Sequence, residues 1–474
     1  MVSNKENSVH LLKDAYYENC PGCKFEQDNL LYHGLPVKRL LTLWIIVLAS
    51  ALPISSLFPF LYFMVRDFHV AKKVEDIGFY AGFVGSAFMF GRMLTSVAWG
   101  IFADRYGRKP VIIFGTFIIV IFNTLFGFSG NFWVALVARF LLGSLNGVLG
   151  PIKAYSCELV REEHQALGLS TITASWGVGL IIGPSIGGFL AQPGEKYPNT
   201  FSQDSLFGRF PYLLPCLIIS AFAAVVSVAC FWIPETLHKH VEVKNSCNAA
   251  YEKMEAEGTN GENKENSIFR NWPLMSSIMV YCAFSLHDMA YSEIFSLWAV
   301  SPRGLGGLSY TTEDVGEVLS ISGFGLLMFQ TTLYPIAEKL VGNVMICRVG
   351  GFLAIPLLAC YPLIAKLSGF PLSLMINIAS LLKNVISVSI ATALFVMQNR
   401  AVEQHQRGVA NGIALTAMSL FKAIGPAFGG LMFSWSQKRL NASFLPGAEL
   451  VFFVLNVVEL IAVLMTFKPF LTLH

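Results

Sequence analysis

The sequence predicts an all-α membrane protein with twelve transmembrane helices in two six-helix bundles. Three observations support this prediction: an apolar composition, twelve long apolar runs, and a polar segment that divides the runs into two groups of six. Of the 474 residues, 54% are hydrophobic and 13% are charged, and the mean hydropathy is +0.58. A typical soluble domain carries about 25% charged residues, so this composition excludes a soluble multidomain protein.

The apolar runs are each about 20 residues or longer, the length that an α-helix needs to cross a bilayer. We expect them near residues 40–65, 77–103, 111–128, 132–154, 167–191, 210–233, 272–299, 313–337, 345–365, 371–397, 408–434 and 447–469. An even number of spans puts both termini on one side. Lys and Arg are enriched in the segments on that side, so the positive-inside rule assigns it to the cytosol.

The polar segments complete the domain organisation. Residues 1–39 are expected to form a cytosolic N-terminal tail that contains Cys-Pro-Gly-Cys. Residues 40–233 hold the first six runs, and residues 271–474 hold the last six. Residues 234–270 are polar and lack apolar periodicity, so we expect a cytosolic linker between the two bundles.

A basic turn separates the second and third runs. Gly107 permits a tight turn, and Asp104 is positioned to accept hydrogen bonds from the N-terminus of a neighbouring helix. The cations of this turn are Arg105, Arg108 and Lys109. Because cations fix the end of a span at the cytosolic headgroups, we interpret the turn as a latch between helices on that side.

The fifth run carries a glycine at every fourth position together with one proline. Its motif residues are Ser170, Gly179, Gly183, Pro184, Gly187 and Gly188. Glycines four residues apart share one helix face. Two interpretations stay open: the glycines let helices approach closely, or they form a tightly packed seam that bends at the proline. The pattern Gly-Pro-x-x-Gly-Gly returns 242 residues later, at Gly425–Gly430.

Four sequence elements together resemble a known family. The turn Trp-Gly-x3-Asp-x2-Gly-Arg-Lys resembles the loop between spans 2 and 3 of the major facilitator superfamily, and the fifth-run motif is similar to that of its antiporter branch. With Cys20-Pro-Gly-Cys23 and Pro234-Glu-Thr-Leu-His238, they resemble the plant zinc-induced-facilitator-like family over essentially the whole chain. The resemblance implies the major facilitator fold.

The same resemblance implies a proton-coupled antiporter, not an enzyme, that exports a small organic solute from the cytosol. The solute would be a metal chelator such as nicotianamine or a phytosiderophore, which links the protein to zinc and iron homeostasis. Auxin, drug or potassium-linked antiport remains an alternative, and so does a non-transporting receptor for metal or chelator. The resemblance favours the vacuolar membrane over the plasma membrane, a monomer, and no cofactor.

Composition and motifs agree with a gradient-driven transporter. The chain lacks the GxxxxGK[ST] loop that binds ATP phosphates, so we expect no ATP hydrolysis on this chain. Its formal net charge of +3 follows from the cytosolic bias of Lys and Arg and implies no nucleic-acid partner.

Charged side chains within the predicted spans are costly, at about 2.5–3.5 kcal/mol each near the bilayer centre, and they usually face a cavity or a partner. The charged and histidine side chains of the spans are Arg92, Arg139, His287, Asp288, Glu293, Lys383, Lys422 and Glu459. A carboxylate in a dry site can exchange a proton near neutral pH, so Asp288 and Glu293 are the candidate proton carriers. Alternatively, they form structural ion pairs with Arg139 or Lys383.

By analogy with the superfamily, runs 1, 4, 7 and 10 surround a central cavity, which would make Arg139, His287 and Lys383 substrate-binding residues. His287, Asp288 and Glu293 diverge by about 100° or more around one helix, so that helix alone does not bring three ligands to a metal ion. Arg139 and Lys383 would also repel Zn²⁺. A cavity with both signs of charge suits an amino-carboxylate zwitterion.

Cys20 and Cys23 supply half of a possible zinc site in the N-terminal tail. His238, in the predicted linker, is a candidate further ligand. The alternative is a chance pair of reduced thiols, because one CxxC motif alone is weak evidence for a metal. We expect such a site to regulate the protein and to lie outside the path of the solute.

Overall fold

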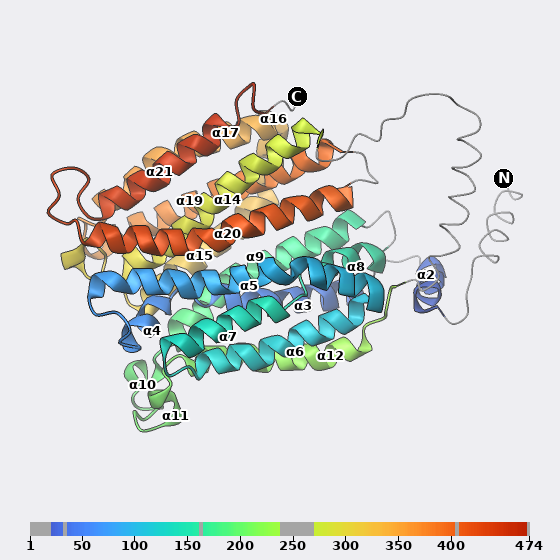
Figure 1. The fold of residues 1–474 in the computed structure, drawn as a ribbon, viewed down its shortest axis with the longest axis horizontal. Helices are drawn as coiled ribbons and strands as arrows, with labels where there is room; N and C mark the ends of the chain where they lie inside the picture. The colour runs from blue at the N-terminus through green and yellow to red at the C-terminus, as the bar shows by residue number, and fades with distance from the viewer. Residues whose placement is uncertain (1–19, 32–35, 161–164, 238–269, 403–406, 472–474) are drawn as a thin grey trace, which may run out of the picture.

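The computed structural model describes residues 20–31, 36–160, 165–237, 270–402 and 407–471, and within these ranges all regular secondary structure is helical (Figure 1). The first bundle consists of α3 (Val37–Ser55), α4 (Leu61–Asp67), α5 (Ile77–Tyr106), α6 (Arg108–Gly127), α7 (Phe132–Leu145), α8 (Pro151–Leu159), α9 (Gln165–Leu190) and α12 (Leu213–Ala229). The second bundle consists of α14 (Trp272–Val300), α15 (Thr312–Thr332), α16 (Tyr334–Val341), α17 (Asn343–Ala359), α18 (Tyr361–Ile364), α19 (Gly369–Arg400), α20 (Arg407–Gln437) and α21 (Ala448–Leu464).

Short helices lie outside the two bundles. They are α2 (Pro21–Leu31), α10 (Pro193–Lys196), α11 (Leu206–Arg209) and the 3₁₀ turns η1 (Val74–Asp76), η3 (Cys230–Trp232) and η5 (Arg303–Leu305). Helices α10 and α11 connect α9 to α12, at the lower left of Figure 1. Helix α2 precedes the first bundle and lies at the opposite end of the molecule.

Each of the twelve expected runs contains at least one of these helices, so the predicted all-α membrane fold is confirmed. Among the described residues, eight helices are long and apolar enough to cross a membrane by themselves. The apolar helix α7 is shorter, with 14 residues. The structure thus has the elements of a multi-pass membrane protein.

Four of the expected runs are interrupted where proline occurs. The breaks separate α3 from α4, α7 from α8, α15 from α16, and α17 from α18. The prolines at or next to them are Pro59, Pro151, Pro335 and Pro362. Proline lacks the N–H that a helix interior requires, yet it fits the first turn of a new helix, as it does in α8, α16 and α18. Pro59 instead lies just before α4.

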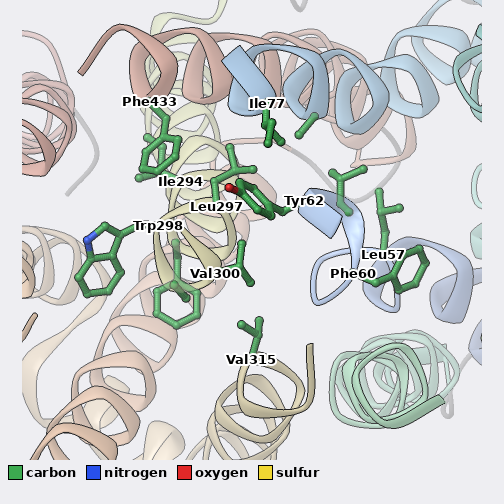
Figure 2. Close-up of a cluster of buried hydrophobic side chains, with 14 of the residues drawn as sticks. Leu57, Phe60, Tyr62, Ile77, Ile294, Leu297, Trp298, Val300, Val315 and Phe433 are labelled. Atoms are coloured by element: carbon green, nitrogen blue, oxygen red, sulfur yellow. The ribbon is translucent and has the colours of Figure 1, made fainter. Parts of the chain in front are cut away.

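We call the end of the molecule with the basic turn 104–109 the latch end, and the opposite end the far end. At the far end, a cluster of buried apolar side chains joins the two bundles (Figure 2). It includes Leu57, Phe60, Tyr62 and Ile77 from the first bundle, and Ile294, Leu297, Trp298, Val300, Val315 and Phe433 from the second. Burial of this apolar surface holds the bundles together at the far end.

Glycines bring helices of opposite bundles into backbone contact at the far end. A Cβ at Gly430 of α20 would lie 2.2 Å from the carbonyl oxygen of Gly78 in α5. A Cβ at Gly188 of α9 would lie 2.8 Å from the Cα of Gly316 in α15. Toward the latch end, on the right of Figure 1, α5 and α20 diverge. The structure is therefore closed at the far end.

Two ion pairs add to this closure. Lys438 Nζ lies 2.5 Å from Asp76 Oδ1, which ties the segment after α20 to η1. Lys196 Nζ lies 3.5 Å from Glu313 Oε1, which ties α10 to α15. Burial lowers the pKa of Lys196, and the neighbouring Glu313 carboxylate partly offsets this effect. Both pairs connect the first half of the chain to the second.

Candidate functional site

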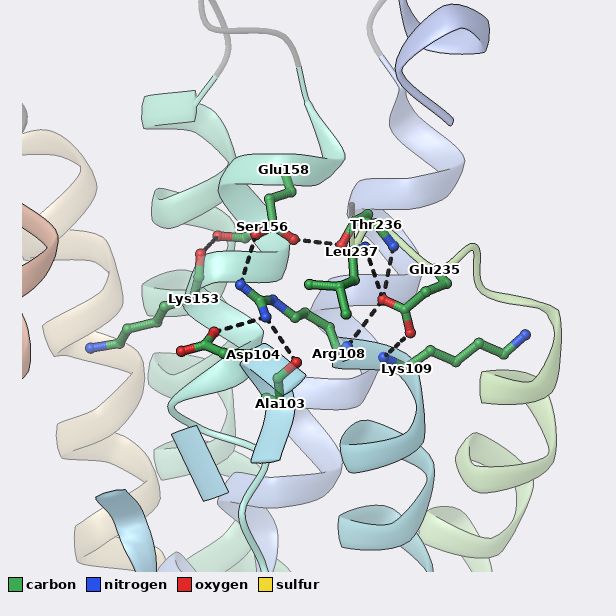
Figure 3. Close-up of polar contacts among 10 residues, drawn as sticks. All are labelled: Ala103, Asp104, Arg108, Lys109, Lys153, Ser156, Glu158, Glu235, Thr236 and Leu237. Atoms are coloured by element: carbon green, nitrogen blue, oxygen red, sulfur yellow. Dashed lines mark hydrogen bonds and ion pairs between the residues drawn. The ribbon is translucent and has the colours of Figure 1, made fainter. Parts of the chain in front are cut away.

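The latch is built around Arg108, the first residue of α6 (Figure 3). Its Nη1 lies 2.8 Å from Asp104 Oδ1 and donates to the carbonyl oxygen of Ala103, also at 2.8 Å. Its Nη2 lies 3.1 Å from Glu158 Oε1 in α8. One buried guanidinium therefore connects α5, α6 and α8. In the described residues, these contacts all lie within the first bundle.

Glu235, in the segment after η3, caps the N-terminus of α6. Its carboxylate accepts hydrogen bonds from the backbone N–H groups of Arg108 at 3.0 Å and Lys109 at 3.1 Å. The first N–H groups of a helix lack partners within the helix, and the helix dipole favours an anion there. We predicted this role for Asp104. Instead, the side chain of Asp104 is 72% exposed and pairs with Arg108, because the chain after η3 places Glu235 nearer to α6.

Gly107 meets two requirements at once. Its φ is +117°, a conformation that L side chains rarely adopt. A Cβ there would also lie 2.3 Å from Glu235 Oε2. The other latch cations lie on the surface or at its edge: Arg105 stacks over Tyr106 at 5.7 Å, and Lys109 Nζ donates to the carbonyl oxygen of Phe231 at 2.7 Å.

The glycine motif of α9 has two faces. A Cβ at Gly183 would lie 1.9 Å from Ser55 Oγ, and one at Gly187 would lie 2.0 Å from the carbonyl oxygen of Ser56, so these glycines pack against the end of α3. Gly179 packs against α3 in the same way. Gly188 and the carbonyl of Pro184 instead meet α15 of the second bundle. Ser170 lies in α9, and its side chain is outside the described part of the structure.

The repeated motif in α20 follows the same arrangement. A Cβ at Gly425 would lie 2.7 Å from Met289 Cβ in α14, the first helix of its own bundle, and Gly429 also packs against α14. Gly430 meets α5 of the other bundle. In both motifs, two glycines bind the helix to its own bundle and the last glycine contacts the opposite bundle.

A small enclosed pocket lies between the bundles, on the latch-end side of the far-end contacts. Its lining residues are Ile54, Leu57, Phe58, Gly85, Phe88, Met89, Arg139, Met289, Glu293 and Pro426. They come from α3 and the turn after it, α5, α7, α14 and α20. The pocket is mostly apolar, and its two charged residues, Arg139 and Glu293, come from opposite bundles.

Glu293 is enclosed in this pocket. The residue is 1% exposed, and neither carboxylate oxygen has a hydrogen-bond partner among the described residues. Arg139 faces the same pocket and interacts with Glu293 electrostatically, with no ion pair shorter than 4 Å between them. Arg139 Nη1 donates to the carbonyl oxygen of Pro53 at 2.9 Å, and its guanidinium lies 5.2 Å from the ring centre of Phe88.

Asp288 is one of the two candidate acids, and it forms an ion pair. Lys383 Nζ lies 3.1 Å from Asp288 Oδ1, donates to Ser387, and stands 4.3 Å from the ring centre of Tyr291. The Lys383 side chain is 1% exposed, whereas that of Asp288 is 41% exposed. Asp288 is therefore both paired and accessible to solvent in the middle of α14.

His287 lies away from these groups, so its position does not support the predicted substrate-binding role. Its Nδ1 lies 2.9 Å from Glu459 Oε2 in α21, and both side chains are 2% exposed. His287 precedes Asp288 in α14, and consecutive residues diverge by about 100° around a helix. His287 therefore points into the second bundle, toward α21. Sequence reasoning gave Glu459 no role, since its partner depends on how α14 and α21 face each other.

Cys20 and Cys23 are buried at the start of α2. His238 lies outside the described residues. Within the described ranges, no three His, Cys, Asp or Glu side chains gather closely enough to hold a metal ion. The expected regulatory metal site stays a prediction.

Comparisons with known proteins agree with the helical membrane fold described above. Residues 43–426 match the family model described as Major Facilitator Superfamily. Two Arabidopsis thaliana proteins, ZINC INDUCED FACILITATOR-LIKE 1 and ZINC INDUCED FACILITATOR 1, are each 59% identical to this chain over 98% of it and over 98% and 97% of their own lengths. The solved D-xylose-proton symporter has a TM-score of 0.71 at 14% identity, covering 90% of this chain and 96% of that one.

Proposed function

Since the chain belongs to the Major Facilitator Superfamily and, within it, to the zinc-induced-facilitator-like family, we propose that this membrane transporter is a proton-coupled antiporter. It exports a small organic solute from the cytosol, with the latch end facing the cytosol. The solute is a metal chelator that carries amino and carboxylate groups, such as nicotianamine or a phytosiderophore. The vacuolar membrane is the proposed location. The names of two relatives, which refer to zinc, support a role in metal homeostasis.

The observation that carries this proposal is the position of Glu293. Its carboxylate lies between the bundles, enclosed and opposite Arg139, and no described residue forms a hydrogen bond with it. A carboxylate that alternates between an enclosed and a hydrated environment takes up and releases a proton as its surroundings change. Rocking of the two bundles would alternate the surroundings of this pocket between the two sides. Glu293 is therefore the proposed proton carrier.

Asp288 and Lys383 supply opposite charges one and a half turns closer to the latch end. Asp288 is accessible to solvent and can meet an amino group of the solute. Lys383, held by Asp288 and Ser387, can turn toward a carboxylate. We propose that this pair contacts the solute, while Glu293 handles the proton in the dry pocket.

The test is uptake of radiolabelled nicotianamine into proteoliposomes with an imposed pH gradient. The wild type should accumulate the solute only while the gradient persists. Glu293→Gln should lose accumulation driven by the gradient but retain exchange of labelled for unlabelled solute, because only the proton step is removed. Glu449→Gln, which changes an exposed carboxylate at the start of α21, is the matched control and should behave as the wild type.

Two results would contradict the proposal. Accumulation by the wild type that is indifferent to the gradient would reject proton coupling. Gradient-driven accumulation by Glu293→Gln at the wild-type level would reject Glu293 as the carrier. In that case, the same measurement on Asp288→Asn shows whether Asp288 carries the proton.

A further inference from the structure

We propose that Arg92, Lys153 and Lys422 form a second binding site, which recognises carboxylate groups, on the latch-end side of the central pocket. The solute class that fits this site is a polycarboxylate. This inference rests on the proposed transport function and deepens it by naming the charge that the solute must carry. The site includes none of the residues that the preceding sections assign to the proton or to the solute.

Helix geometry places Arg92 and Lys422 beside the pocket. Arg92 lies on the face of α5 that carries the pocket residues Gly85 and Met89, because positions i, i+4 and i+7 share a helix face. At 1.5 Å per residue, it stands about 10 Å nearer to the latch end than Gly85. Lys422 lies one turn before the pocket residue Pro426 in α20, about 6 Å nearer to the latch end. Helix α20 packs against α5.

Lys153 comes from α8, the helix that follows the proline break after α7. Its side chain points away from the Arg108 cluster of the latch (Figure 3). It interacts electrostatically with both Arg92 and Lys422, and Lys422 interacts in turn with Asp288. Three helices, α5, α8 and α20, thus direct cations to one region next to Asp288.

The three cations lack counterions in the described part of the chain. None of their side chains makes an ion pair or a hydrogen bond there, and each of the three residues is only partly buried. By contrast, Lys383 has its own partner in Asp288. Asp288 is the acid that the electrostatic interactions connect to this cluster, and it neutralises at most one of the four cations.

Like charges in such a position repel one another, and each costs about 2.5–3.5 kcal/mol near the centre of a bilayer. A bound anion removes the repulsion and supplies charge-assisted hydrogen bonds. Three separate cations from three helices match a solute with two or three carboxylates better than a single anion. The same cations would repel a bare metal ion, and a neutral solute would leave them unpaired.

The experiment measures uptake kinetics in proteoliposomes for Arg92→Gln, Lys153→Gln and Lys422→Gln. Each variant should raise the KM for nicotianamine by about tenfold, the effect of losing one hydrogen bond to a charged group. Lys153→Arg and Lys422→Arg keep the charge and should stay close to the wild type. Lys72→Gln is the matched control, because Lys72 is an exposed cation at the far end.

Direct binding separates this inference from the transport proposal. The tricarboxylate tricarballylate should bind to the purified protein in calorimetry, and its trimethyl ester should not. Binding should weaken about tenfold in each Gln variant and stay unchanged in Lys72→Gln. If nicotianamine is not transported but tricarballylate binds in this pattern, the transport proposal fails and the site stands. Equal binding of the ester, or Gln variants that bind as the wild type does, would overturn the site.

Discussion

At the scale of single residues, surroundings distinguish two acids that lie five residues apart on one helix. Asp288 is partly exposed and paired with Lys383, whereas Glu293 is enclosed and has no hydrogen-bond partner among the described residues. A paired, hydrated carboxylate keeps its charge through a cycle more easily than an enclosed one. This difference is the physical reason for assigning the solute to Asp288 and the proton to Glu293.

The latch permits a test of capping at the same scale. Glu235→Gln should destabilise the protein by about 1 kcal/mol, because the N-terminus of α6 loses its anionic cap. Asp104→Asn should change stability by less than about 0.5 kcal/mol, since Asp104 forms an exposed pair within one turn. Thermal unfolding of the purified protein in detergent measures both. A larger loss for Asp104→Asn than for Glu235→Gln would reject the assignment of the cap.

Sequence reasoning could identify the important residues here but not all their partners. The cost of charge in a membrane singles out Arg139, Asp288, Glu293 and Lys383, and all four lie at or near the interface between the bundles. Which acid is paired depends on the rotation of each helix about its axis, which composition does not encode. Glu235 had a usable signal, an acid directly after a span, and we read it only as part of a family motif.

At the scale of elements, the repeated Gly-Pro-x-x-Gly-Gly motif shows how a sequence repeat becomes a structural one. In both α9 and α20, two glycines pack against the first helix of the same bundle, and the last glycine meets the other bundle. The twelve apolar runs could be predicted because a span needs a fixed length of apolar residues. The breaks within four runs were missed, since a proline can either bend a helix or end it.

The α20 motif predicts which glycine controls closure of the far end. In Gly430→Ala, the new Cβ would lie 2.2 Å from a backbone oxygen of α5, so far-end closure should lose about 1–3 kcal/mol. In Gly412→Ala, on the same helix, nothing lies within 4 Å of the new Cβ, and closure should not change. Distances between spin labels at Lys72 and Asn441, measured by pulsed electron resonance, report the opening.

The two variants should differ in their spin-label distances. Gly430→Ala should increase the population with longer label distances by about fivefold or more, and Gly412→Ala should leave the distribution as in the wild type. An unchanged distribution in Gly430→Ala would mean that α5 and α20 adjust to the methyl group without separating. The role of the last glycine in closure would then be wrong.

At the scale of the whole molecule, closure at the far end combines one apolar cluster, two glycine contacts and two ion pairs. The apolar cluster and the glycine contacts are neutral, so they do not depend on the sign of a charge. The two ion pairs do depend on charge, and they join the two halves of the chain beside the bundles. Changes in these two contacts can therefore adjust closure without altering the core.

The pair of Asp76 and Lys438 allows this idea to be tested by reversing charges. The two side chains are 29% and 49% exposed, so the pair contributes about 0.2–1 kcal/mol to closure. Asp76→Lys places two cations together and should increase the far-end-open population by up to about fivefold, because the repulsion replaces an attraction of similar size.

Combining Asp76→Lys with Lys438→Asp restores an opposite-charge pair and should return the spin-label distances to those of the wild type. High salt should weaken the effect of the single variant. Failure of the double variant to recover would show that Asp76 or Lys438 acts through another contact, and this pair would then not be a separate contribution to closure.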